Sequence, residues 1–272
     1  MDVHKETIQS IKKDIFEKRI VTTSIDGIIR IFENKSQPDN ALDFSLECEI
    51  KSDHGSCLKA VFMHNNEYIA ASFSSGMLLI LKKDFKNSYA IKYEHQVYTG
   101  VINDISSSYN NKYNIHCACA DGKIRTVSFQ EGENLQVSEI TAHRFGISTI
   151  DSNSNFIVSG GIDYSIAIWE NEKEIVRFRD HSCYVREVCI APDNIFSILC
   201  FASCGDDGKV FIYWKYKEEY LKQEIVLDGP VYSLIWSKSG FTLSIGYGSN
   251  KFKCYEPKKD GKFEEVELIK EN

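Results

Sequence analysis

The chain has 272 residues, 43% of them hydrophobic, and a formal net charge of -7 at pH 7. Acidic chains with only short charge runs do not have the basic footprint of nucleic-acid-binding proteins. The first ten residues are polar and lack the apolar core of a signal peptide, and no apolar run approaches the roughly 20 residues of a membrane span. We therefore expect a protein with a substantial core, no nucleic-acid partner and no direct insertion into a membrane.

Short apolar runs separated by turn residues predict β-strands from the beginning of the chain onward. The first four are Thr7–Lys12, Arg19–Ser24, Ile28–Glu33 and Leu42–Ile50. This succession of four strands recurs, and no helical pattern or long linker is left between the copies. We expect one domain over residues 1–272 with six such sheets, or blades, at about 4–50, 54–93, 95–140, 143–178, 181–226 and 228–269.

Every copy contains a turn residue that is followed six residues later by an apolar, often aromatic, residue. The clearest pairs are Asp163 with Trp169 and Asp26 with Phe32. The six turn positions are 26, 75, 121, 163, 207 and 249, so they lie 42 to 49 residues apart. This spacing is close to the ~40–45-residue period of a WD-repeat propeller blade. The predicted fold class is therefore all-β, a six-bladed WD-repeat β-propeller.

In WD-repeat proteins a loop histidine, a second-strand serine, the turn aspartate and a third-strand aromatic form a hydrogen-bonded set. The fourth blade has the complete set, His143, Ser159, Asp163 and Trp169. The fifth blade has His181, Ser203, Asp207 and Tyr213, with a tyrosine hydroxyl in place of the indole N–H as the donor. Because the arrangement repeats, we interpret it as structural rather than as a catalytic triad. Trp214 follows Tyr213 by one residue, which predicts that its side chain lies on the opposite face of the sheet.

Nine cysteines are present, an odd number, and most lie inside expected strands. No pair has C-x-x-C spacing, and Cys117 with Cys119 supplies only two ligands, too few for a zinc site. The sequence therefore predicts buried, reduced thiols in a cytosolic or nuclear compartment, with no metal and no cofactor.

The strand count bears on how the ring of blades closes. Most propellers close when one terminus supplies a strand to the blade formed by the other, but here each expected blade has four strands of its own. We therefore expect an open propeller whose exposed sheet face and edges are completed by a partner chain. From strand position alone, the candidate partner-binding residues are Thr7, Ile8, Val231 and Tyr232.

Several stretches, spread over nearly the whole chain, resemble one known family. They are 19–24 with 29–32, 142–143 with Gly146, 159–161 before Asp163, 181–182 with 185–188 and 191–192, and 236–237 with 239–240. On these residues the chain is similar to the Sec-thirteen family, WD-repeat subunits of the COPII outer coat and of the nuclear pore Y-shaped complex. It departs from the WD pattern at the third-strand aromatic, where Phe32, Leu81, Val127, Tyr213 and Tyr255 replace tryptophan.

The resemblance implies a structural scaffold of ER-to-Golgi transport rather than an enzyme. Family members are open six-bladed propellers that receive a seventh blade from a helical-solenoid partner. The partner is the COPII cage subunit in the coat and a helical-solenoid nucleoporin in the pore. The implied location is cytoplasmic, on ER-derived vesicles, and at the nuclear pore.

Two alternatives remain open at this point. One is the Seh-type nucleoporin, another open six-bladed propeller. The other is a peptide-binding WD-repeat substrate receptor, for which Arg144, Tyr184 and Arg186 are candidate contacts in the loops at one end of the blades. A stable, stoichiometric solenoid partner favours the scaffold, and weak peptide binding by a monomer favours the receptor.

Overall fold

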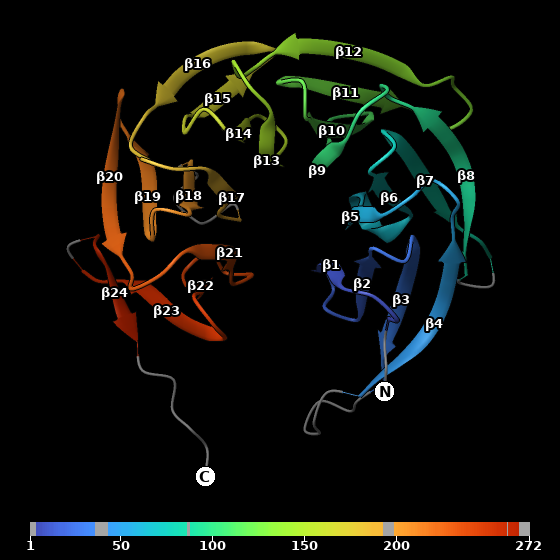
Figure 1. Cartoon of the computed structure of the whole chain (residues 1–272), viewed down its shortest axis with the longest axis horizontal. Helices are drawn as coiled ribbons and strands as arrows, with labels where there is room; N and C mark the ends of the chain where they lie inside the picture. Colours follow the sequence, from blue (N-terminus) through green and yellow to red (C-terminus); the bar gives the residue numbers. More distant parts are fainter. Residues whose placement is uncertain (1–3, 36–42, 86–87, 193–198, 260, 267–272) are drawn as a thin grey trace. The chain divides into compact units, whose positions relative to one another are not determined.

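The computed structural model describes residues 4–35, 43–85, 88–192, 199–259 and 261–266. Within these ranges the chain forms six antiparallel sheets, each built from four strands that follow one another in the chain (Figure 1). A single 3₁₀ turn, η1 (His64–Asn66), is the remaining regular element of the described part. The all-β fold class predicted from the repeat is thus confirmed.

The first three sheets have the following strands. Sheet one contains β1 (Ile8–Lys13), β2 (Arg19–Ser24), β3 (Ile28–Asn34) and β4 (Phe44–Lys51). Sheet two contains β5 (Cys57–Phe62), β6 (Tyr68–Phe73), β7 (Met77–Lys83) and β8 (Tyr89–Gln96). Sheet three contains β9 (Ile102–Tyr109), β10 (Tyr113–Cys119), β11 (Lys123–Phe129) and β12 (Gln136–Thr141).

The last three sheets repeat the pattern. Sheet four contains β13 (Ile147–Ser152), β14 (Ile157–Gly161), β15 (Ile166–Glu170) and β16 (Lys173–Phe178). Sheet five contains β17 (Val185–Ile190), β18 (Cys200–Gly205), β19 (Lys209–Tyr216) and β20 (Glu219–Val226). Sheet six contains β21 (Val231–Trp236), β22 (Leu243–Tyr247), β23 (Lys251–Pro257) and β24 (Phe263–Val266).

One predicted blade boundary differs from the observed sheets. His95 was expected in a loop that opens the third blade, but it lies in β8 and pairs with Leu78. The reason is that β7 begins at Met77 and offers ladder partners as far as Gln96. In addition, residues 267–269 of the sixth predicted blade and the first residue of the predicted strand Leu42–Ile50 lie outside the described residues.

The chain divides into two compact units, Met1–Thr141 and Ala142–Asn272, with three sheets each. The single domain over residues 1–272 therefore stays a prediction. In the first unit, one apolar cluster lies between sheets one and two and includes Val21, Ile31, Ile69 and Leu79. A second cluster, with Tyr68, Ile80, Ile115 and Phe129, lies between sheets two and three.

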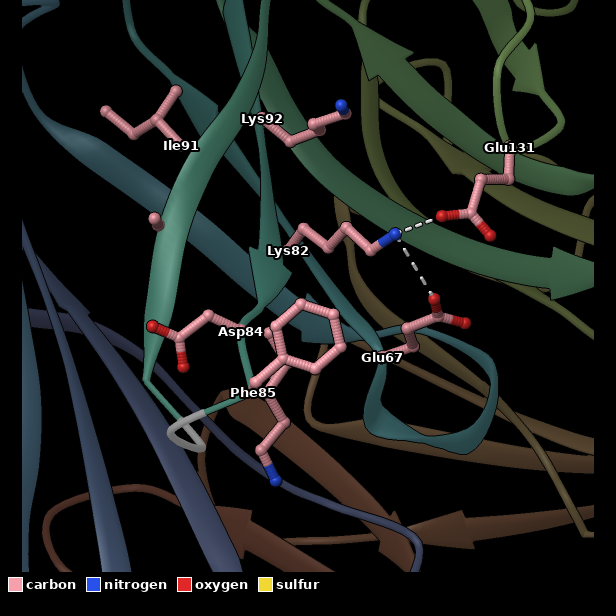
Figure 2. Close-up of a pocket in the computed structure, with 9 residues that line it drawn as sticks. Glu67, Lys82, Asp84, Phe85, Ile91, Lys92 and Glu131 are labelled. Carbon is pink, nitrogen blue, oxygen red and sulfur yellow. Dashed lines mark hydrogen bonds and ion pairs between the residues drawn. The ribbon is translucent and has the colours of Figure 1, made fainter.

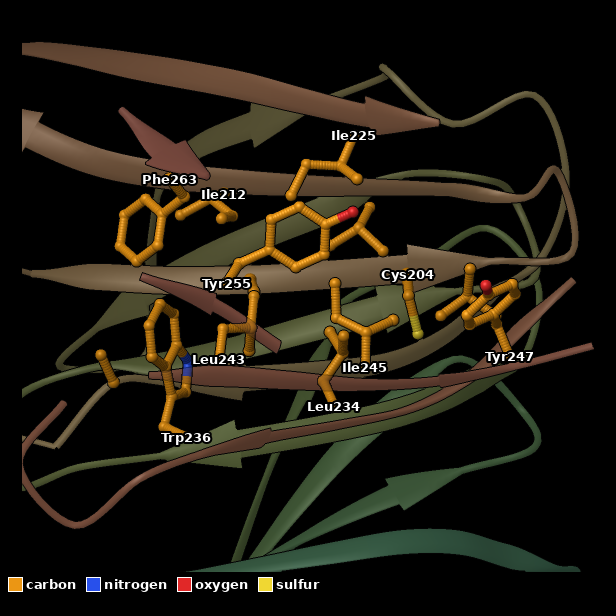
Figure 3. Close-up of a cluster of buried hydrophobic side chains, with 14 residues drawn as sticks. Cys204, Ile212, Ile225, Leu234, Trp236, Leu243, Ile245, Tyr247, Tyr255 and Phe263 are labelled. Atoms are coloured by element: carbon orange, nitrogen blue, oxygen red, sulfur yellow. The ribbon is translucent and has the colours of Figure 1, made fainter. Parts of the chain in front are cut away.

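The second unit is built in the same way. Val158, Ile168, Phe201 and Tyr213 belong to the cluster between sheets four and five. The cluster between sheets five and six is shown in Figure 3, where Trp236 packs edge-on against Phe263 at 5.6 Å between ring centroids. Trp214 packs against this second cluster and Tyr213 against the first, so the predicted opposite faces are confirmed.

Each sheet has a β-bulge at the same place, one residue after the start of its first strand. In sheet six the register shifts between Val231 and Ser233, and in sheet one between Ile8 and Ser10. A bulge leaves one residue unpaired and re-aims the side chains around it. In β21 this residue is Tyr232, which is exposed while Val231 stays in the core. The bulge therefore decides which of two neighbouring side chains faces solvent.

Candidate functional site

In sheet four the histidine set forms one continuous chain of hydrogen bonds. The Trp169 indole N–H donates to Ser159 Oγ at 2.9 Å, and Ser159 Oγ lies 2.9 Å from His143 Nε2. His143 Nδ1 lies 2.9 Å from an Asp163 carboxylate oxygen. When His143 Nε2 accepts from the serine and Nδ1–H donates to the aspartate, all four side chains are satisfied. The structure therefore brings together the four residues selected from the sequence.

Asp163 is held ionised at the centre of the turn. Burial alone would raise its pKa, but hydrogen bonds from His143 and from Ser165 outweigh burial and hold the pKa of Asp163 well below its usual range. Its second oxygen accepts the Arg144 backbone N–H at 3.3 Å. The carboxylate thus joins the loop before β13 to the turn between β14 and β15.

Sheet five has the same histidine, serine and aspartate contacts, but its aromatic residue makes a different hydrogen bond. His181 Nε2 lies 2.9 Å from Ser203 Oγ, and His181 Nδ1 lies 3.0 Å from Asp207. Tyr213 does hydrogen-bond with Ser203 as part of the set, but it is not the donor there, because its hydroxyl donates to Asp180 at 3.1 Å. The hydroxyl group lies beyond the end of the phenol ring, where the carboxylate of Asp180 accepts its hydrogen bond. Burial, followed by the charge of Asp180, raises the pKa of Tyr213.

Sheet one contains a third set that the sequence analysis did not assign in full. His4 Nε2 lies 2.8 Å from Thr22 Oγ1, and His4 Nδ1 lies 3.1 Å from Asp26. The signal was available, because Thr22, Ser159 and Ser203 each precede their turn aspartate by four residues. A rule of "Ser or Thr four residues before the turn Asp" would have found the hydroxyl in all three sheets.

Sheet three replaces the histidine with a tyrosine. The Tyr98 hydroxyl donates to the Val101 carbonyl at 2.6 Å and accepts the Ala120 N–H at 3.0 Å. The guanidinium of Arg125 lies 4.5 Å from the centroid of the Tyr98 ring and pairs with Asp121. Loop and turn are therefore joined in this sheet too, by a different donor.

These sets hold loops in place and offer no open reactive group. The Ser159 and Ser203 side chains are fully buried, and their hydroxyls are already used within the sets. A nucleophile needs both an accessible oxygen and a base that is free to take its proton. The geometry thus matches the structural interpretation made from the repeat.

A shallow pocket of about 530 Å³ lies on the outer strands of sheet two and the turn after β11. Figure 2 shows Lys82 pointing at Glu131 and Glu67 inside it, and both carboxylates form ion pairs with the ammonium group. The hydrogen bond to Glu131 raises the pKa of Lys82. A lysine that acts as a base or nucleophile needs a lowered pKa, so this pocket is not arranged for such chemistry.

The cysteines of the described residues are all free thiols. Burial raises the pKa of Cys119 to about 11 and that of Cys200 to about 12. Such thiols are inert because the thiolate is the reactive form. In the described ranges no group of three His, Cys, Asp or Glu side chains could hold a metal ion, and no helix is long and apolar enough to cross a membrane.

The four candidate partner-binding residues lie in different environments. Thr7 and Ile8 are exposed at the start of β1, and Tyr232 is exposed in β21. Val231 is not available to a partner, because it is 0% exposed in the cluster between sheets five and six. The correction follows from the bulge after Val231, which separates the two neighbours onto different faces.

Sheet six has one face packed on sheet five and one face that its own unit leaves uncovered. Leu234, Trp236 and Ile245 lie in the buried cluster, so the alternating residues Ile235 and Phe252 lie on the other face. Ile235 is 48% exposed and Phe252 is 64% exposed. We call this surface the sheet-six outer face; its residues are Ser233, Ile235, Ser244, Gly246, Phe252 and Cys254.

Sheet one has a comparable face in the other unit. Val21, Ile31 and Ile50 pack toward sheet two. The alternating residues include Ile8, Ile11 and Leu46, which are exposed. Exposed apolar side chains gathered on a sheet face are a feature of protein–protein interfaces.

Comparison with known families agrees with the repeat phase. The model described as "WD domain, G-beta repeat" matches residues 134–170 and 172–213. The first match contains β12, β13, β14 and β15, so a sequence repeat is offset by one strand from a sheet. Six four-stranded sheets in this phase define the class of the protein, a six-bladed WD-repeat β-propeller.

Curated proteins within this class are similar to the chain over most of its length. "Protein transport protein sec13" of Aspergillus oryzae is 24% identical over 95% of this chain and 98% of its own length. "Protein transport protein SEC13" of Yarrowia lipolytica is 22% identical over 99% of this chain and 98% of its own length. "Actin-interacting protein 1" of Drosophila melanogaster is 30% identical, but only 34% of that protein is matched. The similarity over nearly the full length of both chains, with the WD-repeat match, supports a WD-repeat protein of the Sec-thirteen kind.

Proposed function

We propose that the chain is a structural scaffold subunit in protein transport, in the outer cage of the COPII vesicle coat. The similarity to protein transport proteins over nearly the full length of both chains supports the transport role. The histidine sets support a scaffold, because their polar groups are used to fix loops rather than to meet a substrate. The chain would then work on the cytoplasmic side of ER-derived vesicles.

The observation that carries the scaffold proposal is the sheet-six outer face. Sheet six already has four strands of its own, yet Ile235 and Phe252 are exposed on it. Removing a fully exposed side chain of this size from water is favourable by about 1.5–3 kcal/mol, and these half-exposed side chains would contribute a corresponding fraction. An added sheet from a partner, packed as a further blade on this face, would bury both residues. We infer that the propeller is open and that a helical-solenoid partner donates this blade.

The same surface would serve a second assembly. A helical-solenoid nucleoporin that donates an equivalent blade would place the chain in the nuclear pore Y-shaped complex. The Seh-type nucleoporin alternative uses the same kind of surface and differs only in the partner. Identifying the bound solenoid therefore decides among these three assignments.

Affinity purification of the tagged chain with quantitative mass spectrometry tests the proposal. We expect a stoichiometric helical-solenoid protein to co-purify, and the double variant Ile235→Asp/Phe252→Asp to lose it. Ile175→Asp, on the exposed face of β16 in the same unit, is the matched control and should retain the partner. Unchanged recovery with the double variant, while its melting temperature matches wild type, would show that the partner binds elsewhere.

A further inference from the structure

Exposed aromatic side chains gather on the loops at one end of sheets four and five. Phe145 precedes β13, Tyr164 lies in the turn between β14 and β15, and Tyr184 precedes β17; all three are exposed. The Tyr164 and Tyr184 rings are 5.8 Å apart, and the Ile162 N–H donates to the Gly146 carbonyl beside Phe145. We call these residues, with Arg144 and Ile162, the aromatic loop patch.

Tyr164 occupies a backbone conformation that does not suit it. Its φ is +67°, in the left-handed region that bulky residues rarely adopt. At the equivalent turn position the other sheets have residues that tolerate this region, namely Gly27, Gly76, Gly122, Gly208 and Asn250, all with positive φ. A glycine would therefore relieve strain at position 164.

Core packing does not offset the energy of this strained conformation, because Tyr164 is 42% exposed. Among the six equivalent turn positions only sheet four has a bulky residue in this region, and strain without core packing directs attention to what the side chain contacts. An exposed tyrosine offers a large rigid surface and a hydroxyl, which are the properties of anchor residues at protein interfaces. The position therefore indicates a surface that meets another molecule.

The charges on the patch indicate what it meets. Asp206 is engaged by Arg186 through two contacts of 2.7 Å, and Asp163 is engaged by His143 and Ser165. Arg144 is exposed, its guanidinium lies 5.5 Å from the centroid of the Phe145 ring, and no described carboxylate pairs with it. A guanidinium over an aromatic ring keeps its N–H groups free for a carboxylate.

We propose that the aromatic loop patch binds a protein segment in which Asp or Glu lies close to an aromatic or large aliphatic residue. The carboxylate accepts hydrogen bonds from Arg144, and the apolar side chain packs on Tyr164 and Tyr184. This surface is separate from the sheet-six outer face, because it lies on loops of sheets four and five. It gives the scaffold a second docking site whose ligand differs from the donated blade.

Selection of a random heptapeptide display library on the purified full chain, followed by calorimetry of the enriched peptides, tests the proposal. We expect enrichment of peptides with Asp or Glu within three positions of an aromatic or Leu residue. Arg144→Glu and Tyr164→Gly should each weaken their binding at least tenfold. Tyr164→Gly should leave the melting temperature equal or higher, because it removes strain.

Tyr216→Ser and Lys217→Glu are the matched controls. They remove another exposed tyrosine with a cation over its ring, at 5.5 Å, in the same unit. These controls should leave binding within twofold of wild type. Enrichment of basic peptides or of no motif, equal binding by Arg144→Glu, or a lower melting temperature of Tyr164→Gly would each overturn the proposal. Self-association that Arg144→Glu abolishes would assign the patch to a second copy of the chain and overturn it as well.

Discussion

A largely buried aspartate side chain is tolerated in the turns because each of its oxygens has a donor. Asp163 receives hydrogen bonds from His143, Ser165 and the Arg144 N–H, and Asp207 receives them from His181 and the Ser182 N–H. Without these hydrogen bonds, the buried charge would destabilise the folded state strongly. At the residue scale, the stability of a loop therefore depends on keeping each acceptor in place.

Asp163→Ala should lower the free energy of unfolding by about 1–3 kcal/mol, because it leaves buried donors of His143 and Ser165 without an acceptor. Urea denaturation at pH 7 measures the change. Asp228→Ala, which removes an exposed ion pair with Lys251, is the control and should leave the urea midpoint close to that of wild type. Equal midpoints for Asp163→Ala and wild type would contradict the assignment of the set.

His116 gives the fold a predictable pH dependence. Its ring lies 2.9 Å from both Ser108 Oγ and Thr126 Oγ1, and burial lowers its pKa from 6.5 to about 4. Between these values the unfolded chain binds a proton that the folded chain does not, so stability falls as pH drops from 6.5 to 4. The loss should approach roughly 3 kcal/mol.

His116→Gln removes the titrating ring and should flatten this part of the stability profile, which urea midpoints at pH 7, 5.5 and 4.5 measure. His64→Gln, at an exposed ring stacked on Tyr109, should keep the wild-type slope. A His116→Gln profile as steep as that of wild type would show that other groups dominate the pH dependence.

At the scale of the strand, periodicity and turn chemistry predicted most of the fold. The strand Arg19–Ser24 was predicted to the residue, because its run of apolar and threonine residues ends two positions before the turn aspartate Asp26. Sequence could not locate the bulge in β21, since it depends on how β22 pairs with the strand. For this reason Val231 and Tyr232 were both candidates, and only Tyr232 is exposed.

The histidine sets also show what sequence spacing cannot predict. The histidine, serine or threonine, and aspartate of each set were predictable from their spacing along the chain. The acceptor of Tyr213 was not, because Asp180 lies 33 residues away in the sequence and is brought close only by folding. The uncovered faces of sheets one and six also had to be read from the register of the strands.

A charge at Val231 should destabilise the fold much more than a charge at Ile235. Val231→Asp buries an unpaired carboxylate in the cluster with Leu234 and Trp236, and we expect a loss of about 3 kcal/mol or more in the free energy of unfolding. Ile235→Asp, on the sheet-six outer face, should cost about 1 kcal/mol or less. Thermal melts of the two variants measure the difference, and similar losses would contradict the face assignment.

At the scale of the whole molecule, the core is apolar and does not depend on cross-links. The nine cysteines are free, and burial raises the pKa of thiols such as Cys119. We expect the melting temperature to be the same with and without a reducing agent. We also expect most thiols to react with a thiol reagent only after unfolding. A lower melting temperature under reducing conditions would contradict this account of the core.

The central claim is that a partner packs a sheet of its own on the sheet-six outer face. Photo-cross-linking tests it most directly, with Phe252→benzoylphenylalanine in the chain expressed with its co-purifying partner and Tyr216→benzoylphenylalanine as the control. We predict that position 252 captures an alternating apolar strand segment of the solenoid partner and that position 216 does not. A cross-link from position 252 only to helical repeats, or none at all in an intact complex, would contradict the donated blade.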